Sequence, residues 1–529
     1  MHLHLIICFA LLIWWPEERL CPAAFTSPAW TWLVVFAQVP AFFLAAVWTS
    51  TTALRRLDGT GGGPQRAQHF YHRSTSILRM LAVAAFVASL FFTRWSEVVR
   101  SVNLLAAVPG LAGLIILLPF FGASVMIFLG TYPIDRSLHQ ITLESRPGEA
   151  RPGVRVWSRG QYLSFNLRHH LLVVAVPMAL ILAAFDWSRS HEASLIRLFR
   201  LQWAPEVAPA VAAAVIFVFA PAMLRYIWPT KPLADGPLRR ELESICRRIG
   251  FRYRDILVWQ SGGMMVNAAV MGLFAPVRYV MLSDGLLDTM SSRQIEAVFG
   301  HEVGHIRHHH IPFFLLFAVC SMLVLSAVIE ALRLGVERGF FELSVVTIQA
   351  IGFVCILAVW GIGFGWISRR FERQADLFGT RCVTSTSPEG CKLPCSAHGH
   401  SPAYQPPATA VCATATAVFA SALDRVAVLN GIPPDERSWR HGSIADRIRF
   451  LTALSGDPGC ARRFRRLVRR IKAAVLLLAV GGSVIAAVYL WDHPVYGFGV
   501  GVERAAAGSA GRYQAPSPAG DSRDVRTDH

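Results

Sequence analysis

A histidine–glutamate motif in the middle of the chain is the first feature that could do chemistry. The pattern His-Glu-Val-Gly-His contains His301, Glu302 and His305, and a capping box of Ser291 with Gln294 precedes it, so we predict that a helix begins there. His301 and His305 then share one helix face and can hold one zinc ion, with Glu302 beside them to take a proton from zinc-bound water. A hydrogen-bonded pair of histidines without metal is the alternative.

A third ligand would separate these two interpretations. Glu372 and Asp376 lie four residues apart in a polar, helix-compatible segment, and hence on one face. Two predicted membrane helices separate His305 from Glu372 and return the chain to the side it left, so Glu372 can reach the same metal. Asp376 can accept a hydrogen bond from a ligand histidine and fix its tautomer. The alternative is a solvated, arginine-paired face beside the membrane.

Composition places these residues in a membrane protein. Apolar residues make up 53% of the 529 residues and charged residues only 16%, where a soluble domain carries about 25% charged. The net charge of +17 comes almost entirely from arginines scattered through loops, which is not the clustered footprint of a nucleic-acid-binding protein. Ten cysteines in a chain of this length do not indicate a disulfide framework. We therefore expect a lipid bilayer and no nucleic acid among the partners.

Nine segments are apolar enough to be candidate membrane helices. They are Leu3–Trp15, Trp30–Trp48, Ile77–Phe92, Leu104–Leu129, Leu171–Phe185, Val207–Trp228, Phe313–Leu332, Val345–Trp366 and Ala473–Trp491. The first could instead be a secretory signal, but it lacks a basic beginning and a small-residue cleavage site.

The distribution of arginine predicts the orientation. Loops 51–76 and 130–170 are arginine-rich, and the loops between them are poorer. This alternation predicts that the N-terminus and the two large polar regions, 229–312 and 367–472, lie on the cytoplasmic side. We expect the membrane to be the plasma (inner) membrane.

Three short β-prone runs precede the histidine motif. They span Asp255–Gln260, Ala268–Leu273 and Arg278–Leu282, and we predict that they form a small meander. An exposed edge of such a sheet would bind a peptide through main-chain hydrogen bonds.

The stretches around the motif resemble the integral-membrane gluzincin metallopeptidases, a family that includes the HtpX heat-shock protease and the CAAX prenyl protease type I. The resemblance rests on His-Glu-Val-Gly-His and on Ser-Arg-Arg-Phe-Glu-Arg-Gln-Ala-Asp from position 368, and it covers roughly 233–454. It implies one Zn²⁺ held by His301, His305 and Glu372. Catalytic roles follow for Glu302 as general base and for Asp376 as support of a ligand.

Two flanking segments extend the resemblance. Asn267 and Ala268 match an Asn-Ala edge strand that pairs with extended substrate, and His441 and Arg447 match residues that approach the catalytic centre and could stabilise an oxyanion. Gly442 stands where the family usually has proline.

The predicted fold class is mainly α: a multi-pass helical membrane protein with a zincin-type metalloprotease domain on the cytoplasmic face. We divide the chain into an N-terminal membrane region with about six helices (1–228), a metallopeptidase domain (229–472) interrupted by a transmembrane hairpin (313–366), a C-terminal helix (473–491) and a disordered tail (492–529). The predicted function is zinc-dependent hydrolysis of peptide bonds in membrane-associated or misfolded proteins, so that the partner is a polypeptide substrate. The alternatives are a signal-transducing membrane metalloprotease and a non-catalytic scaffold.

Two further groups of residues depart from this scheme. After Asp376, the sequence from Gly379 onward is interpreted as an insertion, whose Cys391, Cys395, His398 and His400 could suit a second metal but are better explained as unpaired residues of a loop. The run His308 to His310 is interpreted as interfacial rather than as metal-ligating.

Overall fold

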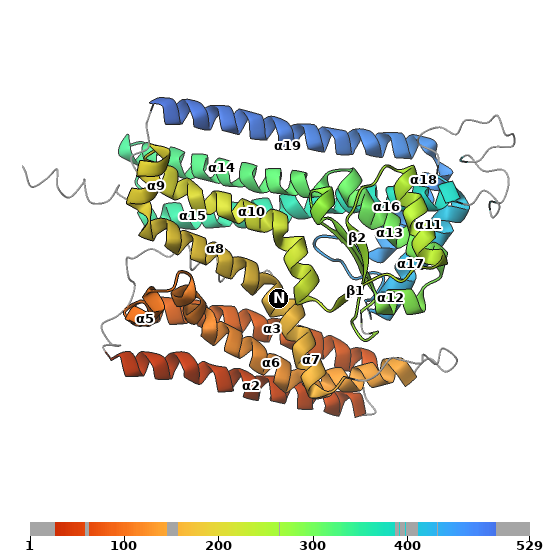
Figure 1. Cartoon of the computed structure of the whole chain (residues 1–529), viewed down its shortest axis with the longest axis horizontal. Coiled ribbons are helices and arrows are strands. Elements are labelled where there is room, and N and C mark those ends of the chain that lie inside the picture. Colours follow the sequence, from red (N-terminus) through yellow and green to blue (C-terminus); the bar gives the residue numbers. More distant parts are fainter. Residues whose placement is uncertain are drawn as a thin grey trace, which may run out of the picture.

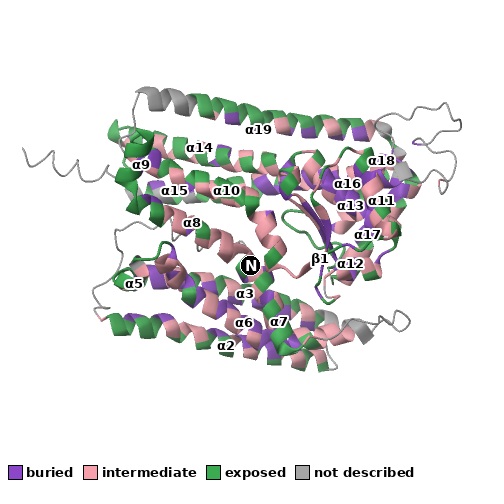
Figure 2. Ribbon diagram, in the orientation of Figure 1, coloured by how far each residue is buried: buried purple, intermediate pink, exposed green. Residues whose placement is uncertain are grey.

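The computed structural model describes residues 27–58, 63–144, 157–263, 265–386, 391, 397, 411–430 and 432–492 of the chain. Long helices lie side by side, and a smaller part made of a sheet and shorter helices sits at one end of them (Figure 1). Exposed residues predominate along α19, whereas buried residues gather around α13 and α16 (Figure 2). The helices are α2 (Pro28–Asp58), α3 (Gly63–Phe92), α4 (Trp95–Arg100), α5 (Asn103–Ala106), α6 (Leu111–Glu144), α7 (Arg159–Asn166), η1 (Leu167–Leu172), α8 (Val173–Ser190), α9 (Glu192–Phe199), α10 (Ala204–Ile227), α11 (Pro237–Arg248), η2 (Ala275–Val277), α12 (Asp284–Thr289), α13 (Ser292–Arg307), α14 (His310–Glu337), α15 (Val345–Ala358), η3 (Val359–Phe364), α16 (Gly365–Thr386), α17 (Ala413–Leu429), α18 (Ile444–Gly456) and α19 (Pro458–Asp492).

The chain is a multi-pass membrane protein. Seven stretches of helix in the described part are long and apolar enough to cross a bilayer, and they coincide with seven of the nine predicted segments. They are Pro28–Asp58, Arg66–Leu90, Leu111–Ile141, Arg159–Ser190, Ala204–Ile227, His310–Glu337 and Ala350–Val383. The predicted first segment and the predicted tail beyond Asp492 lie outside the described residues, and the ninth segment forms the C-terminal half of α19, which packs along α14.

One predicted membrane segment is displaced. The prediction began the fourth segment at Leu104, but residues 103–106 form the separate short helix α5, and the long helix α6 begins only at Leu111. Gly110, with φ +81°, turns the chain between them, and its amide donates a hydrogen bond to Asp186 Oδ2 (2.8 Å) at the end of α8. A left-handed residue cannot continue a helix, so the break precedes Leu111.

The sheet has four strands in the order β1-β2-β4-β3: β1 (Thr230–Pro232), β2 (Asp255–Trp259), β3 (Ala268–Met271) and β4 (Tyr279–Ser283). The predicted meander is wrong in its connections, because β4 lies between β2 and β3 and runs parallel to β2. Every residue of β4 is buried, whereas β3 is only partly so, and the more completely buried strand takes the central position. The prediction that Ala268 lies on an edge strand is confirmed.

The third predicted ligand lies on a membrane helix that continues into the sheet-bearing part. Helix α15 passes through the π-helical segment η3 into α16 without a break. Helix α16 then runs through Gly379 and Cys382 to Thr386, so the prediction that an insertion begins at Gly379 is wrong. Cys395, His398 and His400 of the predicted loop lie outside the described residues.

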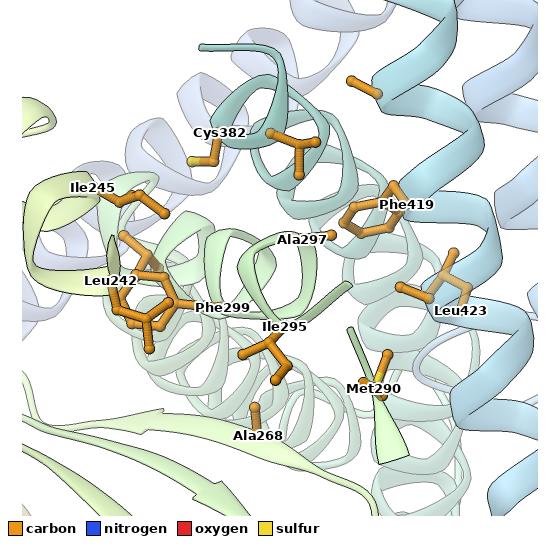
Figure 3. Close-up of a cluster of buried hydrophobic side chains, with 14 of the residues drawn as sticks. Leu242, Ile245, Ala268, Met290, Ile295, Ala297, Phe299, Cys382, Phe419 and Leu423 are labelled. Atoms are coloured by element: carbon orange, nitrogen blue, oxygen red, sulfur yellow. The ribbon is translucent and has the colours of Figure 1, made fainter. Parts of the chain in front are cut away.

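Helix α13 runs through the centre of this part, between the sheet and helices α16 and α17. Its Phe299 packs with Leu242 and Ile245 of α11, and Ala297 faces Phe419 of α17 (Figure 3). Glycines let α13 and α16 approach closely: a Cβ on Gly379 would come 2.7 Å from the Ala297 carbonyl oxygen and 2.8 Å from the His301 amide nitrogen. Backbone atoms cannot move aside as a flexible side chain can, so this contact fixes the spacing of the two helices.

We expect Gly379→Ala to destabilise the protein by about 1–3 kcal/mol, since it overpacks a backbone contact. Gly160→Ala is the matched control, because no atom lies within 4 Å of a Cβ on that helical glycine. Thermal unfolding in detergent should show a lower Tm for Gly379→Ala and an equal or higher Tm for Gly160→Ala. Equal Tm values for both variants would show that α13 and α16 can separate without cost.

Candidate active site

Helix α13 positions the histidine motif. The Ser291 side chain accepts a hydrogen bond from the Gln294 amide, and the Gln294 side chain accepts one from the Ser291 amide, so the predicted capping box is confirmed. The start of the helix is thereby fixed, and the 3.6-residue period directs His301 and His305 toward α16. Gly300 and Gly304 face α16 as well, where a side chain would collide with Cys382, Ala375 or Phe378.

The three predicted metal ligands meet between these helices. His301 Nε2 and His305 Nε2 lie 3.2 Å apart, Glu372 Oε2 lies 3.5 Å from His301 Nε2, and Glu372 Oε1 lies 3.7 Å from His305 Nε2. One ligand atom from each of the three side chains lies within 4.8 Å of the others. Two imidazoles and one carboxylate so close together fit a zinc site of the catalytic kind, which takes three protein ligands and leaves one position open.

The protonation states suit metal binding. Burial, with the neighbouring His301, lowers the pKa of His305 to about 3, so its imidazole is neutral and has a lone pair to offer. Burial raises the pKa of Glu302 to about 7, against the opposing effect of His301. A carboxyl group with a pKa near neutrality can both accept and return a proton, which is the property that a general base and acid requires.

Asp376 and Arg447 lie behind the ligands. Asp376 Oδ1 is 2.9 Å from His301 Nδ1, on the ring edge opposite Nε2. Arg447 donates two hydrogen bonds to the same carboxylate, from Nε to Oδ2 (2.9 Å) and from Nη2 to Oδ1 (2.5 Å). Burial by itself lowers the pKa of Arg447, but the Asp376 carboxylate outweighs it and raises the pKa above its usual value. Asp376 is therefore a charged acceptor that can hold the His301 ring by its Nδ1–H.

His441 approaches the site from its open side. Its Nδ1 lies 3.0 Å from Glu372 Oε1, and 49% of its side chain is exposed. The turn that carries it is closed by paired main-chain hydrogen bonds between Ser438 and Gly442, and Gly442 has φ +76°. Proline cannot adopt this conformation, whereas glycine adopts it readily, so the turn suits Gly442.

The predicted substrate-binding residues lie at the sheet edge beside α13. Asn267 is exposed and precedes β3, and Ala268, the first residue of β3, is buried. Asn430, at the end of α17, holds this segment by accepting a bond from the Val266 amide (3.5 Å) and donating one to the Val266 carbonyl (2.9 Å). The sequence pattern did not indicate Asn430, which is 164 residues from Val266.

Comparison with known proteins agrees with this geometry. Residues 232–395 match peptidase family M48. This matched segment contains the three predicted metal ligands and Glu302. A protease HtpX homolog of Pyrobaculum calidifontis is 29% identical over 169 residues, which are 32% of this chain and 48% of that protein. CAAX prenyl protease 1 of Saccharomyces cerevisiae is 32% identical over 179 residues, 33% of this chain and 37% of that protein.

The chain spans about half or less of the length of these two relatives. The crystal structure of Ste24p from S. mikatae aligns over 79% of this chain and 98% of that one, with 14% sequence identity and a TM-score of 0.32. The predicted resemblance to the family of HtpX and CAAX prenyl proteases is confirmed by the M48 match and by these relatives.

Two residues that the sequence did not indicate, His310 and Gln374, lie close to the predicted ligands. His310 is fully buried rather than interfacial, and its Nδ1 lies 2.9 Å from His305 Nδ1. Its Nε2 lies 3.0 Å from Gln374 Oε1. His310 follows a break in the helix at His309, which has φ +57°, so helical spacing from His305 gives no indication of this contact.

We expect Arg447→Met to lower the free energy of unfolding by about 3–5 kcal/mol, because it leaves the buried Asp376 carboxylate without its guanidinium. Arg449→Met is the matched control, since Arg449 pairs with Asp446 on the exposed side of the same helix and such a pair contributes about 0–1 kcal/mol. Chemical denaturation of the two variants in detergent measures the difference. Equal loss from both substitutions would contradict the proposed role of the buried pair.

Proposed function

We propose that this protein is a membrane-embedded zinc metalloendopeptidase that hydrolyses peptide bonds in membrane-associated or misfolded proteins. The observation that carries the proposal is the meeting of His301, His305 and Glu372 within 4.8 Å, next to the half-buried Glu302. The M48 match and the protease names of the relatives support the same reaction. They do not favour a signal-transducing protease or a non-catalytic scaffold.

When bound, zinc would supply a Lewis acid that polarises the scissile carbonyl and lets water lose a proton near neutral pH. The protein's own groups do the rest of the work. His301, His305 and Glu372 would hold the ion, and Asp376 would keep His301 in the tautomer whose Nε2 is free. Glu302 would accept the proton of the attacking water and deliver it to the leaving amine. The partly exposed His441 is the side chain placed to donate a hydrogen bond to the developing oxyanion, whereas Arg447 acts through Asp376.

The edge strand β3 is the proposed substrate-binding element. It pairs with β4 on one side only, and it lies against α13, which carries the histidines. An extended polypeptide could add to this edge through its main chain, with Asn267 and Ala268 at the start of the binding strand. Recognition through main-chain groups depends little on the side chains of the substrate. A protease that cleaves misfolded proteins of varied sequence requires this tolerance. Nothing in the described residues specifies a pocket for a prenyl group.

We propose that the site lies on the cytoplasmic side of the plasma membrane. Arg55 and Arg56 lie in the last turn of α2, at the end where it packs on Tyr71 of α3 and Ile134 of α6. Trp157, which lies just before α7, packs against Gly262, which follows β2. Arginine-rich ends of membrane helices are typically cytoplasmic, and the site lies at this end.

Glu302→Gln tests the proposed reaction. We expect the variant to bind zinc like the wild type and to lose most of its proteolytic activity, because the amide cannot take up the proton of water. Both proteins would be purified in detergent under chelation, reloaded with zinc and incubated with an unfolded test protein, with cleavage followed on a gel. Zinc-dependent cleavage by Glu302→Gln at the wild-type rate would overturn the assignment.

Glu372→Ala tests the third ligand. We expect a fall in zinc affinity before any other change, since two imidazoles alone would remain to hold the ion. The bound zinc would be measured after dialysis against chelators of graded strength. Unchanged zinc content in Glu372→Ala would show that another group is the third ligand.

A further inference from the structure

We infer that His310 and Gln374 form a hydrogen-bonded relay that positions His305 for metal binding, in parallel with the Asp376–Arg447 pair that positions His301. This inference rests on the proposed zinc site. It assigns a role to a histidine outside the His-Glu-x-x-His motif and to a glutamine between the two acidic residues of α16.

The distances define a continuous chain of polar atoms. His305 Nε2 faces His301 and Glu372, and its other nitrogen, Nδ1, lies 2.9 Å from His310 Nδ1. His310 Nε2 in turn lies 3.0 Å from Gln374 Oε1. Each imidazole therefore uses both of its nitrogens, one toward the metal side and one away from it.

Chemistry allows only one proton arrangement along this chain when His305 binds a metal. A carbonyl oxygen accepts and cannot donate, so the proton of a neutral His310 must sit on Nε2 and point at Gln374 Oε1. Its Nδ1 is then an acceptor, and His305 must donate from its own Nδ1. The His305 Nε2 lone pair is consequently free for the ion. The opposite orientation of the Gln374 amide would put a proton on His305 Nε2 and block binding.

The surroundings hold the His310 ring in place. Its side chain is fully buried and stacks on Phe371, with ring centroids 4.3 Å apart and an interplanar angle of 10°. His309, with φ +57°, lies between α13 and α14 and turns the chain so that His310 comes close to His305. A left-handed conformation costs a non-glycine residue free energy, and such strain persists where the surrounding structure requires it. Lys472 of α19 supports the same turn by donating to the His308 carbonyl.

Helix α16 thus contributes to both supports, which are completed by His310 of α14 and Arg447 of α18. On α16, Phe371 stacks on the His310 ring, Gln374 lies against His310 Nε2, and Asp376 Oδ1 lies 2.9 Å from His301 Nδ1. The two ligand histidines differ in the nature of their support, because His301 faces a charged carboxylate and His305 faces a neutral imidazole. Glu372 and Asp376 already bury two carboxylates at the site, and the neutral imidazole of His310 adds no further negative charge.

The test measures zinc affinity in full-length protein, purified in detergent and stripped of metal, by competition with a chromophoric chelator. His310→Phe keeps the stacking on Phe371 but offers no acceptor, so we expect its affinity to fall by about 10–100-fold. Gln374→Leu should lower it in the same direction and by less. His310→Asn carries an acceptor oxygen near the position of Nδ1 and should recover most of the loss. His309→Asn, an exposed neighbour whose conformation asparagine tolerates, is the control and should bind like the wild type.

The absorption spectrum of bound Co²⁺ gives a second readout, which should change in His310→Phe because the His305 ring is no longer held. If metal-free His310→Phe unfolds at a much lower temperature than wild type, Gln374→Leu decides the matter by the same two readouts. Wild-type affinity and an unchanged Co²⁺ spectrum in the folded variant would overturn the inference. A wild-type protein that binds no zinc would instead overturn the proposed function, and this inference with it.

Discussion

The close contact between α13 and α16 is the constraint on which the site depends. Two of the proposed ligands come from α13 and the third from α16, and the distances among them are set by how near the two backbones come. Gly300, Gly304 and Gly379 remove the side chains that would hold the helices apart. A shift of even one ångström would move Glu372 out of range of an ion held by His301 and His305, because zinc–ligand distances are about 2 Å.

Buried charge is the second consequence of this contact. Glu372 and Asp376 are both buried and one helical turn apart, so their desolvation must be offset by nearby partners. Arg447, from α18, neutralises Asp376 and lies 3.9 Å from Glu372, while His441 reaches Glu372 from outside. Helix α18 therefore belongs to the site although none of its residues is a proposed metal ligand. These partners allow two buried carboxylates to lie side by side next to the membrane helices.

Continuity with the membrane region gives the site its location. Helix α16 extends a membrane helix through η3, and α14 leaves the site as another, so the hairpin between them is tied to both ends of the ligand set. Movement of either membrane helix along its axis would displace Glu372 or His310. A π-helical segment lies directly before the ligand-bearing helix, and such segments are frequent near functional sites because they change the direction of the side chains that follow.

The sequence alone determined the chemistry and the general architecture. The motif spacing indicated His301, Glu302 and His305. The two predicted membrane helices between His305 and Glu372 return the chain to the same side, which indicated Glu372. Long apolar segments predicted seven of the membrane helices that the structure describes. These signals are local or periodic, and local patterns survive in the sequence. The strand order, the Arg447–Asp376 pair, the Asn430 contact and the His310–Gln374 relay were decided only by the tertiary structure. Each joins residues from different elements or across a helix break, and the regular spacing of residues along one helix or strand does not predict such contacts.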